Sequence, residues 1–413
     1  MLRGSKSRLW IASSWGPASH SGQGVGKPNF DPPGVIEKRR TALQTVAPAR
    51  IPTWTRAGLF LDLVYRDTLI VLTTNIKVSV GERIAMKPPV FIVGCPRSGT
   101  SYLYHLLLSA GGFAEFRTQM NVFDVLEPIF GDLGVSQNKR KMMDEWLQSK
   151  AFQVSGLQAE EIQAKVLSEC RGTSDFLRIV MEDVARKQRV DRWIDSTPTN
   201  IPHLLRIKKD FPDARIVHII RDGRDVALSL DKRGWSRPLP WDRDQGLLAA
   251  GLYWEWMVRK GRKAGSMLQP DYLEVRYEDL VHETAETLQR LAVFLHHDLD
   301  YARIKQASIG SVKTPLTSFK EDLERGQFTP VGRWKDKDKF PPDQLAAFEN
   351  LVGNYLEQLG YALSGSNASE NHSFGVKTMR ATYSIWYEFK QWAKINTPLS
   401  RLMVDYSAIL IDK

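Results

Sequence analysis

The chain has 413 residues, of which 42% are hydrophobic and 25% are charged. These proportions are typical of a soluble globular protein, and they exclude a fully disordered chain, a collagen-like chain and a bundle of membrane helices. The net charge is +10, but residues 1–50 hold eight Lys or Arg against two acidic residues, and residues 51–370 are nearly neutral. The central part therefore lacks the basic surface of a nucleic-acid-binding protein, and we expect no nucleic acid as a partner.

The chain contains two cysteines, Cys95 and Cys170, so it predicts neither a disulfide framework nor a zinc site. Few cysteines and the lack of a signal-peptide pattern favour a reducing compartment, and we expect the protein in the cytoplasm. The longest apolar stretch, residues 58–72, is interrupted by three charged residues, so the sequence predicts no transmembrane helix.

The first expected elements lie before the first glycine-bearing loop. Residues 1–50 are rich in Ser, Gly, Pro and basic residues without periodicity, which is typical of a flexible arm. In residues 51–87, apolar residues recur at mixed spacings and indicate a leading helical segment. Val90 to Val93 then form a short apolar run that ends at Gly94, which is typical of a buried parallel strand.

Helical patterns separate three more strand-like runs, at residues 192–195, 214–220 and 272–276. Strands that alternate with helices predict an α/β fold, with a central, mainly parallel sheet flanked by helices, which we place at residues 88–362. A polar linker at residues 363–374 follows. Apolar residues in 375–413 recur every three or four positions, so we expect a C-terminal amphipathic helix that packs on the body, on a second subunit or weakly on a membrane surface.

The first strand leads directly into the loop Gly94-Cys95-Pro96-Arg97-Ser98-Gly99-Thr100-Ser101, and a helical pattern follows. Such a loop binds anions, because glycine lets the backbone approach the ligand and the helix N-terminus adds a favourable dipole. Arg97 adds a fixed charge, and Thr100 and Ser101 add hydroxyl donors. The Walker A pattern requires a lysine where Thr100 stands, which disfavours a kinase or an NTP hydrolase. We interpret Cys95 as a small loop residue rather than a nucleophile.

A second strand-turn-helix segment carries Arg221, directly after the run at residues 214–220. Open α/β sheets bind ligands at the carboxyl ends of their strands, which is where Arg221 lies. If a helix begins near Asp222, Ser229 lies about two turns along it, and Arg221 and Ser229 converge on one anion. We interpret Asp222 and Asp225 as a helix cap and an ion-pairing residue.

Together the two segments resemble the nucleotide-dependent sulfotransferase family, whose members carry sulfuryl groups from 3′-phosphoadenosine 5′-phosphosulfate (PAPS) to hydroxyls or amines. In that family a loop of the form P-[RK]-S-G-T-[ST] holds the 5′-phosphosulfate, and an Arg with a Ser eight residues later holds the 3′-phosphate. Residues 96–101 match the loop, and Arg221 with Ser229 match the pair. The resemblance covers roughly residues 88–360, implies the P-loop-like fold of the family, and implies nucleotide contacts from Arg97, Ser98, Gly99, Thr100 and Ser101.

Three further segments fit the resemblance. Residues 193–200 resemble the segment of the family's second strand that lines the active site. Residues 276–280 resemble the segment whose tyrosine, here Tyr277, meets the adenosine. Residues 331–335 resemble the late loop that closes on the nucleotide, which implies contacts from Gly332, Arg333 and Trp334, with Arg333 near the 3′-phosphate.

The resemblance also implies a mechanism. Arg97 and the loop backbone would stabilise the transferring group and the departing 5′-phosphate, with no metal required. Relatives take the acceptor proton with a histidine after the second strand, which residues 195–198 lack, or with a glutamate after the loop. Glu115, eighteen residues after Arg97, is the first candidate for this base, and His105 and Asp195 are the alternatives.

We therefore predict a PAPS-dependent sulfotransferase that acts on a hydroxyl or an amine of a small-molecule, glycan or lipid acceptor. The sequence names neither the acceptor nor the oligomeric state. Two other classes stay open at this point. A P-loop kinase or NTP hydrolase would show Mg²⁺-dependent ATP turnover, and a non-catalytic adenine-nucleotide-binding module would bind the nucleotide without transferring a group.

Overall fold

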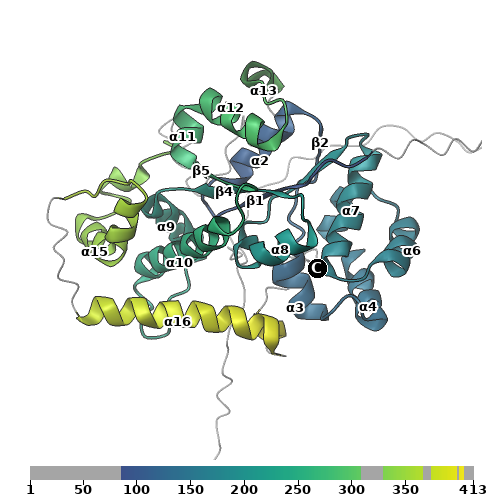
Figure 1. The fold of residues 1–413 in the computed structure, drawn as a ribbon. Coiled ribbons are helices and arrows are strands. Elements are labelled where there is room, and N and C mark those ends of the chain that lie inside the picture. Colours follow the sequence, from purple (N-terminus) through teal and green to yellow (C-terminus); the bar gives the residue numbers. More distant parts are fainter. Residues whose placement is uncertain (1–84, 308–328, 366–373, 398–399, 404–413) are drawn as a thin grey trace, which may run out of the picture. The chain divides into compact units, whose positions relative to one another are not determined.

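The computed structural model describes residues 85–307, 329–365, 374–397 and 400–403 (Figure 1). The predicted basic arm and nearly all of the predicted leading helical segment lie outside these residues, as do parts of the predicted linker and of the last segment. The boundaries drawn for those segments stay predictions.

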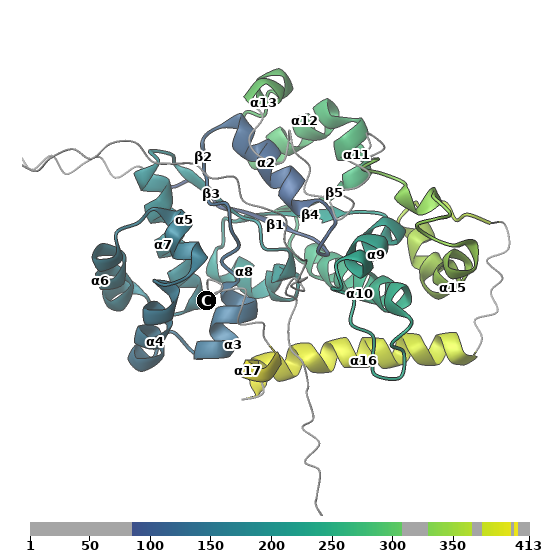
Figure 2. The same ribbon diagram turned by 180° about the vertical axis from the view of Figure 1, so that it is seen from behind.

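In the described residues, five parallel strands form one sheet in the order β2-β3-β1-β4-β5 (Figures 1 and 2). Their bounds are β1 Val90–Val93, β2 Phe113–Ala114, β3 Arg192–Asp195, β4 Arg215–Ile220 and β5 Tyr272–Arg276. Four of them match the predicted runs to within one residue, so the α/β fold with a parallel sheet is confirmed. The sequence does not predict β2, because two residues are too short an apolar run to stand out.

Helices and helical turns connect the strands. Their bounds are α2 Thr100–Ala110, η1 Val122–Leu126, α3 Glu127–Phe130, α4 Ser136–Trp146, α5 Lys150–Ser155, α6 Ala159–Glu169, α7 Thr173–Lys187, η2 Pro198–His203, α8 Leu204–Asp210, α9 Gly223–Lys232, α10 Gly246–Ser266, α11 Tyr277–His282, α12 Thr284–Leu295, α13 Tyr301–Ala307, η4 Arg333–Lys335, α15 Pro342–Gln358, α16 Phe374–Asn396 and α17 Ser400–Met403. Helices α2, α11, α12 and α13 cover one face of the sheet, and α8, α9 and α10 cover the other (Figures 1 and 2).

The two faces of the sheet bury alternate residues of each strand. In β1, Val90 and Ile92 belong to one buried cluster, and Phe91 and Val93 belong to the other. The pleat of the strand causes this alternation, since it points successive side chains to opposite faces. Because helices cover both faces, all four side chains of β1 are buried, and the strand is apolar throughout.

The parallel sheet places the candidate residues at one edge. Gly94 follows β1, Asp195 ends β3 and Arg221 follows β4, and β1 lies between β3 and β4. Since the carboxyl ends of parallel strands meet at the same edge, the glycine loop lies between the other two positions. This is the edge at which open α/β sheets bind ligands.

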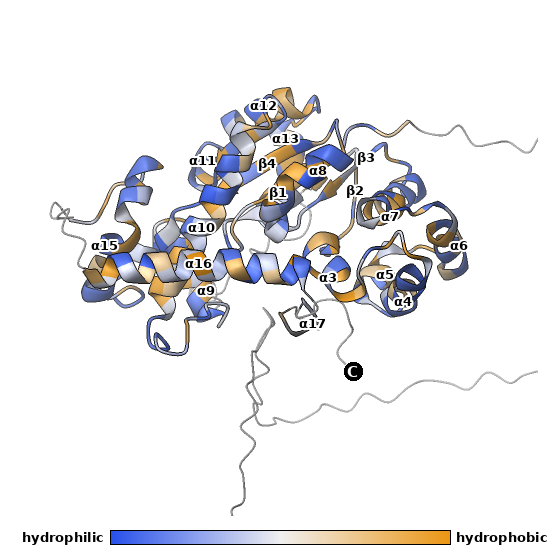
Figure 3. Ribbon diagram, turned by 60° about the horizontal axis from the view of Figure 1, so that its bottom comes forward, coloured by the Kyte–Doolittle hydropathy of each residue, from blue (hydrophilic) through white to orange (hydrophobic). Residues whose placement is uncertain are grey.

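Helix α16 packs against α10. The Tyr387 hydroxyl donates to the carbonyl oxygen of Ala249 at 3.1 Å, and Glu388 pairs with Lys260 at 2.8 Å. Polar and apolar residues follow one another along α16 (Figure 3), so the predicted amphipathic helix is confirmed over these residues. Contact with a membrane surface or a second subunit stays a prediction.

The predicted C-terminal helix is shorter than the segment assigned to it. Helix α16 ends at Asn396, and the separate short helix α17 begins at Ser400. The sequence places Pro398 between them, and proline disfavours the helical conformation of the residue before it. Residues 404–413 lie outside the described part of the chain. Among the residues that the structure describes, no helix is long and apolar enough to cross a membrane.

Candidate functional site

The glycine loop runs from β1 to the first turn of α2 and depends on two glycines. Gly99 has φ +101°, which residues with a side chain rarely adopt, and a Cβ there would lie 2.3 Å from the ring of Tyr277. A Cβ on Gly94 would lie 2.6 Å from the carbonyl oxygen of Ile219 in β4. Both positions therefore need glycine for the loop to fit between its neighbours.

The loop offers hydrogen-bond donors at the N-terminus of α2, whose first residues are Thr100 and Ser101. Within the described residues, no side chain caps this helix, and the buried hydroxyl of Ser98 has no hydrogen-bond partner. Free helix N–H groups and an unpartnered hydroxyl suit an anion. Burial raises the pKa of the Cys95 thiol well above its ordinary value, which supports an inert thiol at this position.

Arg97 joins the loop to α9. Its Nε donates to the hydroxyl of Ser229 at 2.9 Å, and its guanidinium lies 5.8 Å from the ring centre of Trp235. Burial, together with the charges of Arg233 and Arg221, lowers the pKa of Arg97 to about 10. The structure therefore brings together the two sequence motifs that the resemblance assigned to one nucleotide.

Arg221 is buried where β4 ends. Its Nη2 donates to Asp225 at 3.0 Å and to the carbonyl oxygen of Pro330 at 2.6 Å, and its Cζ lies 4.4 Å from the ring centre of Tyr277. Burial disfavours its charge, but Asp225 and then Tyr277 outweigh burial and raise its pKa. Among the described residues, its Nε has no hydrogen-bond partner.

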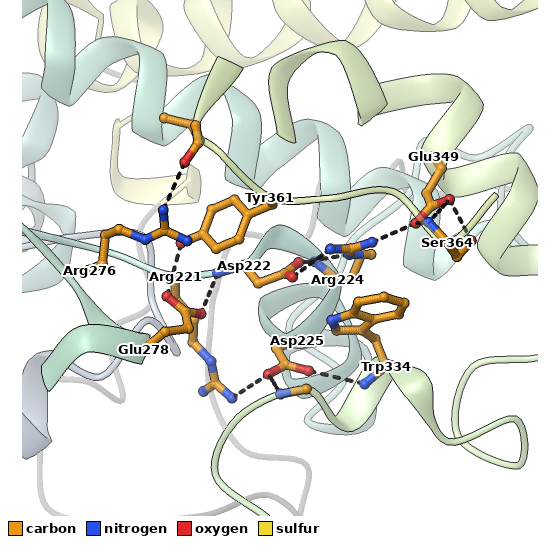
Figure 4. Close-up of polar contacts among 12 residues, drawn as sticks. Arg221, Asp222, Arg224, Asp225, Arg276, Glu278, Trp334, Glu349, Tyr361 and Ser364 are labelled. Atoms are coloured by element: carbon orange, nitrogen blue, oxygen red, sulfur yellow. Dashed lines mark hydrogen bonds and ion pairs between the residues drawn. The ribbon is translucent and has the colours of Figure 1, made fainter. Parts of the chain in front are cut away.

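The late loop meets α9 at Asp225 (Figure 4). The backbone N–H of Gly332 donates to Asp225 Oδ2 at 2.9 Å, and that of Trp334 donates to Oδ1 at 3.1 Å. Arg333 between them is 4% exposed. Burial, together with the nearby charge of Arg221, lowers the pKa of Arg333 to about 10.

A second network holds the late loop from the side of α15 (Figure 4). The Arg224 guanidinium lies 3.5 Å from the ring centre of Trp334 and bonds to Asp222 at 2.8 Å and Glu349 at 2.6 Å. Asp222 also accepts the N–H of Arg224 at 3.0 Å, which confirms its predicted role as the cap of α9. These contacts order one side of the site.

The three candidates for the base lie near Tyr104. Burial raises the pKa of its hydroxyl, and the nearby charges of Glu115 and Asp195 raise it further. Glu115 follows β2, its side chain is 41% exposed, and it is ion-paired with Arg117. His105 lies on α2, and burial and then Arg117 lower its pKa.

Asp195 differs from Glu115 in being buried. Burial raises the pKa of this carboxyl to about 6, although hydrogen bonds from Thr197 work in the opposite direction. Its Oδ1 accepts the backbone N–H of Thr197 at 2.9 Å and the side-chain amide of Asn200 at 3.1 Å. A carboxyl with such a pKa can hold or release a proton near neutral pH.

Two residues organise the site through bonds that the sequence does not predict. Asp225 was assigned an ion pair only, and its bonds to the late loop were not foreseen. Glu278 accepts the N–H of Asp222 at 3.0 Å and the hydroxyl of Tyr361 at 3.0 Å, and so ties α11 to the start of α9 (Figure 4). In the sequence, only its place directly after Tyr277 indicates that Glu278 lies near the site.

Comparison with known proteins shows which family the chain matches. The model of the sulfotransferase family matches residues 88–301. Among curated proteins, no significant match is found. In the part of the chain that the structure describes, no group of three or more His, Cys, Asp or Glu side chains could hold a metal ion.

Several solved structures resemble the chain at low identity. The sulfotransferase domain from the curacin biosynthetic pathway is 16% identical over 68% of this chain and 100% of its own, with a TM-score of 0.44. The sulfotransferase domain of the Synechococcus olefin synthase is 18% identical over 73% of this chain and 95% of its own, with a TM-score of 0.42. A mouse sulfotransferase complexed with PAP is 14% identical over 74% of this chain and 94% of its own, with a TM-score of 0.32.

Proposed function

The chain belongs to the sulfotransferase family, and we propose that it transfers a sulfuryl group from PAPS to a hydroxyl or an amine of an acceptor. The observation that carries the proposal is a cluster of three arginines: the buried Arg221 and Arg333, and the half-buried Arg97. Burial and then neighbouring arginines lower the pKa of Arg97 and of Arg333, and the charge of Asp225 opposes this lowering at Arg333. Clustered cations favour a ligand with several negative charges.

The phosphates of PAPS suit the two parts of the cluster. We assign the 5′-phosphosulfate to Arg97, Ser98, Gly99, Thr100 and Ser101, because the loop combines helix N–H groups with a fixed charge. We assign the 3′-phosphate to Arg221, Ser229 and Arg333, and the adenosine to Tyr277, Gly332 and Trp334. Tyr277 lies against both Gly99 and Arg221, which supports its place beside the nucleotide.

The proposed transfer breaks the bond between sulfur and the bridging oxygen of the 5′-phosphate and forms a bond between sulfur and the acceptor oxygen or nitrogen. Arg97 acts as the main catalytic residue, because a guanidinium can contact two oxygens of the transferring group and of the departing phosphate. The acceptor proton passes to a base.

For the base we now place Asp195 ahead of Glu115 and His105. Asp195 ends β3, next to the strand that carries the glycine loop, and its pKa is raised to about 6. Glu115 follows β2, one strand further out, and already pairs with Arg117. A base works best with a pKa near the working pH and with a short path to the substrate, and Asp195 fits both conditions better.

We infer that the acceptor is a small molecule, a glycan or a lipid and that the protein acts in the cytoplasm. Both cysteines are buried and unpaired, which supports a reducing compartment. The proposed reaction needs no metal, since the arginines supply the positive charge.

Calorimetric titration with adenosine 3′,5′-bisphosphate (PAP), ADP, and ATP with Mg²⁺ tests the proposal. We expect PAP to bind at least about tenfold more tightly than ADP, since only PAP carries the 3′-phosphate. Preference for ATP with Mg²⁺, or no binding of PAP, would contradict the proposal. Tight binding of PAP without transfer to any acceptor of a broad panel would indicate a non-catalytic binding module.

A further inference from the structure

The carboxylate of Asp225 has three donors from two distant segments of the chain (Figure 4). Arg221 Nη2 and the N–H of Gly332 donate to Oδ2 at 3.0 and 2.9 Å, and the N–H of Trp334 donates to Oδ1 at 3.1 Å. The side chain is fully buried. Asp225 thus connects the end of β4 to a loop more than a hundred residues later in the sequence.

The late loop depends on this connection for its conformation. It contains a single short helical turn, η4, and Gly332 before it has φ +74°. Two of its N–H groups are directed to one carboxylate rather than to a strand or a long helix. The backbone on both sides of Arg333 is therefore fixed by Asp225, and so is the approach of Arg333 to Arg221.

Two possible roles of Asp225 predict opposite effects on anion binding when its charge is removed. A phosphate bound between Arg221 and Arg333 would lie near this carboxylate, and like charges repel. If Asp225 served only as a counter-charge for the empty site, its neutralisation would strengthen the binding of an anion. If it positions the loop, its neutralisation would weaken binding, because Arg333 would lose its place.

We propose that Asp225 is a positioning residue that fixes Arg221 and the loop at residues 332–334 in the arrangement that recognises the 3′-phosphate of the nucleotide. This inference rests on the proposed function. Asp225 would act through Arg221 and this loop, to which it is bonded, and not by contact with the reacting atoms. An asparagine keeps the shape of the side chain, but in either orientation its amide nitrogen cannot accept a bond, so either the N–H of Trp334 or the N–H groups of Gly332 and Arg221 lose their acceptor.

Titration of Asp225→Asn with PAP and with adenosine 5′-monophosphate, which lacks the 3′-phosphate, tests the inference. We expect the Kd for PAP to rise by about 10- to 100-fold, as for the loss of charge-assisted hydrogen bonds, and the Kd for the monophosphate to change by less than about threefold. Asp213→Asn removes one exposed carboxylate elsewhere and should leave both constants unchanged. Tighter binding of PAP, or an equal loss for both nucleotides, would overturn the inference.

A measurement on the wild type covers the case in which Asp225→Asn fails to fold. The inference expects slow hydrogen exchange at the amides of Gly332 and Trp334 before any nucleotide is added, because Asp225 already holds them. Fast exchange at both amides would overturn it. If the wild type itself binds PAP and the monophosphate equally, the proposed function fails, and this outcome is separate from any effect of Asp225.

Discussion

The nucleotide side and the acceptor side of the proposed site are built differently. On the nucleotide side, Asp225 bonds to an arginine after β4 and to the late loop, and that arginine, Arg221, donates to the carbonyl oxygen of Arg97 in the loop after β1. On the acceptor side, Glu115 follows β2 and Asp195 ends β3. The comparison teaches that the proposed phosphate site combines arginines with bonded backbone segments, whereas the proposed acceptor side consists of single side chains whose roles must be tested one by one.

The largest effect should come from Arg97, which the account places at the transferring group. Arg97→Ala should lower turnover by about 10²- to 10³-fold, the usual loss when a group that stabilises transition-state charge is removed. Transfer from radiolabelled PAPS to an acceptor that the wild type sulfates measures this. Arg178→Ala on α7, an exposed arginine, is the control. A near-normal rate in Arg97→Ala would show that Arg97 does not stabilise the transferring group.

A smaller effect should separate the two carboxylates of the acceptor side. Asp195→Asn should lower turnover by about 10²-fold or more, the contribution of a general base, and Glu115→Gln by less than about threefold. A base must be deprotonated, so the wild-type rate should fall as the pH drops below about 6, where Asp195 takes up a proton. The reverse order of the two variants would make Glu115 the base.

The smallest effect concerns the attachment of α16. Burial alone would raise the pKa of Asp124, but Lys394 at 2.5 Å and His203 lower it below its ordinary value. Lys394→Ala should therefore reduce the free energy of unfolding by about 1–3 kcal/mol at pH 7, because it leaves a largely buried carboxylate without its cation. Urea denaturation measures this.

The pH dependence of that effect has a definite sign. A carboxyl whose pKa is lowered in the folded state stabilises the protein above its unfolded pKa of about 3.9, and this stabilisation is lost as the pH falls. The difference between wild type and Lys394→Ala should shrink in acid. Lys377→Ala on the exposed side of α16 should stay within about 0.5 kcal/mol of the wild type. An equal change in the free energy of unfolding for both variants would show that the pair of Lys394 with Asp124 does not hold α16 in place.

The fold could be predicted because four of its strands are short runs with apolar residues, separated by helical patterns. The strand β2 could not, since Phe113–Ala114 carries no pattern of its own and is placed by pairing with β3. The end of α16 also differed from prediction, because periodicity alone does not locate a helix end.

The nucleotide side could be predicted from local spacing, and the resemblance named its residues. The bonds of Asp225 could not be predicted, since Gly332 lies 107 residues away and only the folded chain brings them together. The sequence also does not predict that Asp195 is buried, and this burial changes which carboxyl suits the role of base. The sequence therefore proposes which residues form the nucleotide side, which stays a prediction, and it does not show how they are held.

A crystal structure of the protein with PAP tests the central claim most directly. The account predicts the 3′-phosphate between Arg221 and Arg333 and the 5′-phosphate at the N-terminus of α2, beside Arg97 and Ser98. A PAP molecule bound with its phosphates exchanged, or bound away from this edge of the sheet, would contradict it.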